Sequence, residues 1–177
     1  DSISLKPWES LSLPRDLYDH LCEQYGKKTT KKIGMAFLEN TKDITLHINT
    51  SKWTKKMFCE ELRKAGVAVK KAYYMDDTVI ISGVEDIKKI PGYEEGVFFV
   101  QDESSMLPVL CAGIRPGYKV VDVCSAPGGK AMHALLCLKG EGSLSARDKT
   151  VSKVKKIEEN FGRLKFQNVS CKVWDAT

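Results

Sequence analysis

The chain has 177 residues, of which 42% are hydrophobic and 29% are charged, and its formal net charge is +5. This composition is typical of a globular protein with a buried core and excludes a disordered chain. No apolar run approaches the roughly 18–20 residues that a membrane-spanning helix needs, and residues 1–4 lack the features of a signal peptide. We therefore expect a cytoplasmic protein that does not bind membranes. The positive charge suits a polyanionic partner without requiring one.

The first 40 residues predict a helical lead-in. Pro14 favours a helix start, apolar residues follow it at a spacing of four, and Gly26 is expected to end this helix. A second helix is expected to begin at Thr29 or Thr30, either of which can cap it.

Residues 41–100 predict a small α+β module. Ile44, Leu46 and Ile48 alternate with polar residues, which indicates a half-buried strand, and Thr54 is expected to cap a helix. The further expected elements are strands over 67–74, 78–82 and 97–100 and a helical piece over 87–90. The order β-α-β-β-α-β is that of ferredoxin-like modules, including RNA-recognition-like ones, but order alone does not assign a function.

Residues 101–177 predict the first half of a Rossmann-like α/β sheet. The expected elements alternate: helix 103–111, strand 119–124, a helix to about residue 138, strand 143–146, helix 150–161 and strand 169–174. Such alternation produces parallel β-α-β units with right-handed crossovers.

The glycine loop, Asp122–Lys130, is the segment with the most chemical information. It follows the first strand of the predicted parallel sheet, where α/β proteins bind ligands. Gly128 and Gly129 lack a Cβ, so that a ligand can approach the backbone. The following helix offers free N–H groups to a carboxylate or phosphate, and Lys130 adds a cation. The loop lacks the GxGxxG pattern of dinucleotide-binding proteins, which disfavours an oxidoreductase.

Two acidic residues are predicted at the ends of the next two strands. An aspartate at the position of Asp148 can accept both hydroxyls of a ribose, and Asp175 can accept the amine of an adenine. Either residue alone is more often a helix cap or turn residue. Together with the glycine loop, they predict an adenosyl ligand with an amino-acid tail, for which S-adenosylmethionine is a better fit than NAD.

These motifs resemble those of the Sun family of RNA cytosine-C5 methyltransferases, in particular the bacterial 16S ribosomal RNA enzymes. The matching pieces occur in the family's order: Ser12-Leu13-Pro14, Gln101–Met106, Asp122–Lys130, Glu159-Asn160, Arg163-Leu164 and Asp175-Ala176. The string from Cys124 to Lys130 is highly specific, and the preceding Gln101–Ser105 makes a chance match improbable.

The resemblance implies a set of S-adenosylmethionine contacts. They are Cys124, Ser125, Ala126, Pro127, Gly128, Gly129 and Lys130 in the loop, Asp148 at the ribose, Asp175 at the adenine, and Lys153 nearby. Lys153 stands where the family more often has arginine, and Ser125 replaces a common alanine. His47 also stands at a position that is usually arginine, which either weakens an RNA contact or is neutral.

The resemblance also implies the chemistry. Family members attack cytosine C6 with a cysteine thiolate, which activates C5 toward the methyl group. We expect the attacking cysteine to lie downstream of Thr177. This chain should then hold no catalytic residue and should be inactive alone. Cys124 is expected to belong to the cofactor loop. The expected partner is RNA, with ribosomal RNA favoured, and self-association through an open sheet edge is possible. The alternative is a non-catalytic adenosyl- or RNA-binding module.

No metal site is predicted, because the cysteines and histidines are widely spaced. The six cysteines are at least 13 residues apart along the chain, so that no CxxC pair occurs. In a chain without an export signal, we expect reduced and mostly buried thiols.

Overall fold

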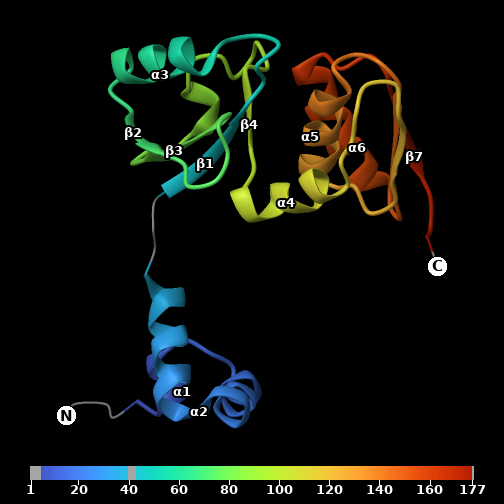
Figure 1. Ribbon diagram of the computed structural model, residues 1–177. Helices are drawn as coiled ribbons and strands as arrows, with labels where there is room; N and C mark the ends of the chain where they lie inside the picture. The colour runs from blue at the N-terminus through green and yellow to red at the C-terminus, as the bar shows by residue number, and fades with distance from the viewer. Residues whose placement is uncertain (1–4, 40–42, 177) are drawn as a thin grey trace. The chain divides into compact units, whose positions relative to one another are not determined.

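The computed structural model describes residues 5–39 and 43–176, and the chain divides into two compact units between Lys42 and Asp43 (Figure 1). Within the described residues, no helix is long and apolar enough to cross a membrane. The same residues contain no cluster of three or more histidine, cysteine, aspartate or glutamate side chains that could hold a metal ion. The predicted domain boundary at residue 100, between the α+β module and the parallel sheet, stays a prediction.

The first unit consists of α1 (Pro7–Ser10) and α2 (Arg15–Leu38). Gly26 has non-helical backbone angles, φ 75° and ψ 155°, which break α2 into two helical halves and confirm the predicted helix end. Thr30 does not cap the second half through its side chain; its buried hydroxyl donates to the Gly26 carbonyl at 3.0 Å.

The second unit begins with a four-stranded antiparallel sheet. Its strands are β1 (Asp43–Ile48), β2 (Ala68–Lys71), β3 (Thr78–Ser82) and β4 (Phe98–Val100), in the order β2-β3-β1-β4. Helix α3 (Lys55–Lys64) follows β1, and a 3₁₀ turn, η1 (Ile87–Lys89), precedes β4. The Thr54 side chain accepts the Met57 N–H at 3.3 Å, which confirms the predicted cap. Phe58 and Leu62 of α3 are fully buried against the sheet.

Strand β2 is shorter than predicted, ending at Lys71 rather than at residue 74. The backbone N–H groups of Tyr73, Tyr74 and Met75 donate to the carboxylate of Glu103 at 2.7–2.8 Å. Because these donors are satisfied by a side chain distant in sequence, the chain leaves the ladder early.

The parallel sheet has three strands in the order β5-β6-β7, namely β5 (Lys119–Asp122), β6 (Ser143–Asp148) and β7 (Val169–Val173). Helix α4 (Glu103–Cys111) leads into it, and α5 (Gly129–Leu138) and α6 (Val151–Leu164) are the crossovers. This confirms the predicted β-α-β alternation. Buried side chains of α5, α6 and β6 form one core, whereas Val121, Val123 and Val173 are 53%, 48% and 50% exposed.

Helix α6 is joined to the antiparallel sheet by Arg163 and Gly96. The Arg163 guanidinium donates to the carbonyls of Tyr93 at 2.8 Å and Phe98 at 3.0 Å, and it lies 4.3 Å from the centre of the Tyr93 ring. Gly96, with φ +70°, lies against the Arg163 carbonyl so closely that a Cβ would overlap it. The arginine of the family motif therefore connects the two sheets of this unit.

We predict that Gly96→Ala destabilises the fold more than Gly83→Ala does. Both glycines have positive φ, but a Cβ at Gly83 meets nothing within 4 Å. Gly83→Ala should therefore lower the free energy of unfolding by about 1–2 kcal/mol, the cost of left-handed backbone alone. Gly96→Ala should add about 1–3 kcal/mol of overpacking. Urea denaturation of both variants measures the difference, and equal losses would disprove the close contact.

Candidate functional site

The glycine loop turns the chain from β5 into α5. The Cys124 N–H donates to the Asp122 carboxylate at 3.2 Å, and the Gly128 N–H donates to the Ser125 carbonyl at 2.6 Å. From α6, the Asn160 side-chain amide donates to the Pro127 carbonyl at 2.9 Å. These bonds fix the loop, and Gly128 precedes the first residue of α5, whose N-terminal N–H groups therefore face the loop.

A cavity of about 260 Å³ lies between the glycine loop and the segment that leads into α4. Gln101, Asp102 and Ser105 contribute to one wall, and the glycine loop contributes to the other. A Cβ on Gly129 would lie 3.7 Å from the Gln101 side-chain nitrogen. The absent side chain of Gly129 thus leaves room between the two walls.

Gly128 has a different role from the one that the sequence suggested. A Cβ at this position would meet Phe161 at 3.5 Å and Ile157 at 3.7 Å, which belong to the core. A side chain at Gly128 would therefore not point at a ligand in the cavity. Glycine is favoured there because φ is +108°, a conformation that L-residues rarely adopt.

Asp148 lies at the end of β6 and is only 2% exposed. Its carboxylate accepts the Ala126 N–H at 3.0 Å and the Lys149 N–H at 2.8 Å, and the Lys153 ammonium lies 3.1 Å away. The Ala126 hydrogen bond, together with those from Lys153 and Lys149, lowers the pKa of this carboxyl below its usual value, although burial opposes the shift. The side chain therefore ties the glycine loop to β6 and α6.

Asp175 lies two residues beyond β7, and its carboxylate pairs with the Lys149 ammonium at 2.9 Å. The Trp174 N–H donates to the Asp148 carbonyl at 2.9 Å, and the Arg147 guanidinium lies 4.9 Å from the centre of the Trp174 ring. The structure thus brings the ends of β6 and β7 together. Asp175 is exposed, whereas Asp148 is buried.

The hydroxyl of Ser125 is a feature that sequence reasoning undervalued. Ser125 is 4% exposed and lines the cavity, and its buried Oγ has no hydrogen-bond partner within residues 5–39 and 43–176. A buried hydroxyl without a partner costs free energy. The wall of the cavity therefore holds an unused donor and acceptor, which a polar ligand can satisfy.

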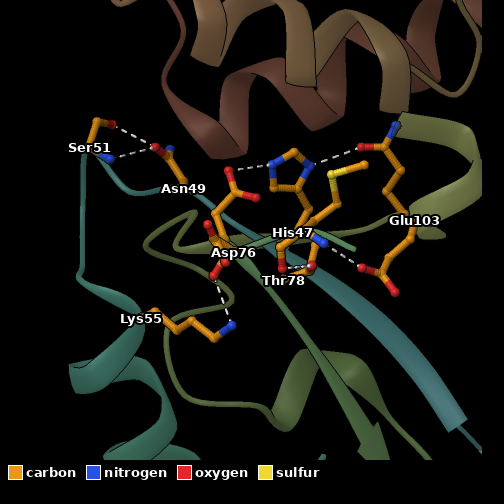
Figure 2. A network of polar contacts seen from close by, with 10 residues as sticks. His47, Asn49, Ser51, Lys55, Asp76, Thr78 and Glu103 are labelled. Atoms are coloured by element: carbon orange, nitrogen blue, oxygen red, sulfur yellow. Dashed lines mark hydrogen bonds and ion pairs between the residues drawn. The ribbon is translucent and has the colours of Figure 1, made fainter. Parts of the chain in front are cut away.

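His47 is fully buried at 0% exposure, so that its side chain does not face the solvent. Its Nδ1 lies 3.1 Å from the Gln101 Oε1 and its Nε2 lies 3.2 Å from the Asp77 Oδ2, and Figure 2 shows the ring bonded on both sides. The His133 ring, on α5, packs against it with 4.7 Å between ring centres. Burial, reinforced by the nearby His47, lowers the pKa of His133 to about 4.

Glu103 anchors the β2–β3 connection to the start of α4 (Figure 2). Burial opposes ionisation of Glu103, but the three backbone hydrogen bonds lower its carboxyl pKa below the ordinary value. Neither Glu103 nor His47 has a local sequence signal for these roles, because their partners are about 30 and 54 residues away in the chain.

The cysteines are less buried than the sequence suggested. All six are free thiols, of which Cys111 and Cys124 are exposed and the others are partly buried. Cys137 and Cys171 pack against the core, and burial raises the pKa of both thiols.

Residues 111–177 match the family model described as 16S rRNA methyltransferase RsmB/F. This part of the chain is therefore similar to that family. The chain is 30% identical over 121 residues to the ribosomal RNA small subunit methyltransferase B of Pseudomonas putida, covering 68% of this chain and 28% of the relative. It is 30% identical over 166 residues to a probable methyltransferase B of Bacillus subtilis, covering 93% and 36%. The chain therefore spans about a third of the length of these relatives. The resemblance to the Sun family is confirmed.

Two solved structures from Pyrococcus horikoshii share the fold. NSun6 with SFG has a TM-score of 0.85 at 17% identity, covering 92% of this chain and 66% of that one. A methyltransferase homologue has a TM-score of 0.81 at 22% identity, covering 96% and 55%. These similarities confirm the predicted Rossmann-like methyltransferase fold class.

We predict that Asp148→Asn lowers the free energy of unfolding at pH 7. Because the folded-state pKa of Asp148 is lowered, its ionised carboxylate stabilises the fold above the unfolded-state value. That contribution is lost as the pH falls through the folded-state value, so that the stabilities of the two proteins should converge at acidic pH. Urea denaturation across this range measures the effect. The exposed Glu85→Gln is the control, and a difference that does not vary with pH would contradict the assignment.

Proposed function

We propose that this chain provides the cofactor site of an S-adenosylmethionine-dependent enzyme that methylates C5 of cytosine in ribosomal RNA. The observation that carries the proposal is the cavity between the glycine loop and Gln101, into which Gly129 presents no side chain. The relatives' names support the reaction: besides the two bacterial enzymes, a 26S rRNA (cytosine-C(5))-methyltransferase of Caenorhabditis elegans is 30% identical over 139 residues.

The polar groups of the cavity suit the amino-acid end of this cofactor. The N-terminal N–H groups of α5 and the unpartnered Ser125 hydroxyl are donors for its carboxylate. The side chains of Asp102 and Asp122, which also line the cavity, are acceptors for its ammonium group. The full loop from Cys124 to Lys130 is part of this proposed site.

The adenosyl end would lie along the ends of β6 and β7. Asp148 would accept the ribose hydroxyls in exchange for its ion pair with Lys153, whose side chain is 52% exposed. Asp175 would accept the adenine amine while it stays close to Lys149. When bound, the cofactor supplies the electrophilic methyl group. Cys124 is proposed as part of the cofactor loop and not as a nucleophile.

We predict that Gly129→Val abolishes S-adenosylmethionine binding, whereas Gly129→Ala retains most of it. The alanine Cβ would make ordinary contacts with Gln101 at 3.7 Å, but the valine methyl groups would extend into the cavity. Isothermal titration calorimetry of the chain and both variants measures the affinity, and circular dichroism confirms that they fold. Unchanged affinity in Gly129→Val would refute the site.

The activity itself is tested by transfer of labelled methyl groups to unmodified small-subunit ribosomal RNA. The assay uses the longest natural protein that carries this sequence. Formation of 5-methylcytosine, lost in Gly129→Val, is the expected result. Cofactor binding without transfer would instead favour a non-catalytic adenosyl-binding module.

For RNA, we propose that exposed lysines of α2 contribute phosphate contacts. They are Lys27, Lys28, Lys31 and Lys32, beyond the Gly26 break. The double variant Lys31→Ser/Lys32→Ser should weaken binding of single-stranded RNA and reduce the slope of log K against log salt by about 0.7 for each phosphate that is no longer neutralised. Lys155→Ser/Lys156→Ser, on the exposed face of α6, is the matched control. Equal slopes in both variants would exclude these α2 contacts. Self-association and a cytoplasmic location stay predictions.

A further inference from the structure

A chain of buried polar contacts connects the antiparallel sheet to the glycine loop. It runs from Asp77, which precedes β3, through His47 on β1, to Gln101, which follows β4. The Gln101 amide nitrogen donates to the Ser105 carbonyl at 3.3 Å. This bond orients the amide so that its oxygen faces His47. The same side chain forms the wall opposite Gly129.

Both ring nitrogens of His47 face oxygen acceptors, the Gln101 amide oxygen and the Asp77 carboxylate. A neutral imidazole has one donor, so only the doubly protonated ring can donate to both oxygens. Asp77 supplies the compensating charge. Burial opposes its ionisation, but the hydrogen bond and charge of His47 lower its carboxyl pKa below the usual value.

The other titratable groups near this pair are on α5. His133 packs against the His47 ring and stays neutral at physiological pH, since its pKa is about 4. Cys137, one turn further along α5, has its thiol pKa raised by burial and by Asp77, so that it also stays neutral. Among the described residues, Asp77 is therefore the group that faces the His47 ring with a charge.

We propose that His47 is a positioning residue for the cofactor site: its ring, anchored by Asp77, holds Gln101 at the distance from Gly129 that S-adenosylmethionine requires. This inference rests on the proposed function. His47 itself does not line the cavity. It acts through the Gln101 side chain, which does.

The test is the pH dependence of S-adenosylmethionine affinity, measured by calorimetry between pH 6 and pH 8.5 on the full chain. A doubly protonated ring makes both hydrogen bonds and a neutral ring only one. If His47 holds Gln101 through both bonds, the wild-type affinity should fall as the pH rises, because one of them is then broken. Asp77→Asn and Gln101→Leu should each bind about tenfold more weakly at pH 6, the scale of one hydrogen bond to a charged group, and should lose the pH dependence.

The double variant Asp77→Asn/Gln101→Leu distinguishes positioning from separate structural effects. Because both residues act through His47, the double variant should bind about as weakly as Gln101→Leu alone. Asn49→Ala is the matched control: Asn49 is also buried on the same module, and its amide donates to the Gly96 carbonyl at 3.2 Å. It should lower stability but preserve the affinity and its pH profile.

Nitrogen NMR of the His47 ring provides a readout that needs no ligand. If His47 donates to both oxygens, we expect two protonated ring nitrogens at pH 6. In Asp77→Asn we expect one of these nitrogens to lose its proton. If the wild-type chain binds no S-adenosylmethionine at any pH, the proposed function fails. Two other results would overturn the positioning role of His47. One is binding in which the Asp77 and Gln101 variants keep the wild-type pH profile. The other is a double variant in which the affinity losses of the two single variants add.

Discussion

The buried carboxylate of Asp148 is the constraint on which the site depends. A parallel sheet places its strand ends along one edge, but the loops that leave those ends are not held by the ladder. Asp148 supplies the missing restraint, because it accepts the N–H of Ala126 in the glycine loop and pairs with Lys153 on α6. Three donors around one ionised group make its removal costly. The carboxylate therefore holds the glycine loop, β6 and α6 together beside the cavity.

The antiparallel sheet also contributes to this cavity, although it has no ligand-binding motif of its own. Gln101 follows its last strand and forms a wall of the cavity, and His47 bonds to that side chain from within the sheet. A second connection joins this sheet to helix α6. It consists of Arg163, which lies on α6, and of Gly96, which precedes β4. The family motifs that surround Gln101 and Arg163 thus have a common physical role: both connect the module to the methyltransferase sheet.

Much of the fold was predictable because its signals are local. Alternating apolar residues identified β1, Thr54 identified the start of α3, and Gly26 identified the break in α2, since each depends on backbone conformation within a few residues. Strand β2 was predicted too long because its propensity continues to Tyr74. The three N–H donors after Ala72 bond to Glu103 instead of a strand, and no local pattern encodes that choice.

The sequence by itself determined the chemistry of the glycine loop and the strand-end acids, because spacing along a β-α-β unit places those residues at one edge. Only the tertiary structure decided what each residue does there. A Cβ at Gly128 would face the core, whereas one at Gly129 would face Gln101 across the cavity. The His47 ring is buried between Gln101 and Asp77. The reason is physical: whether a polar side chain is buried, charged or exposed depends on partners from distant segments, and these meet only when the two sheets pack.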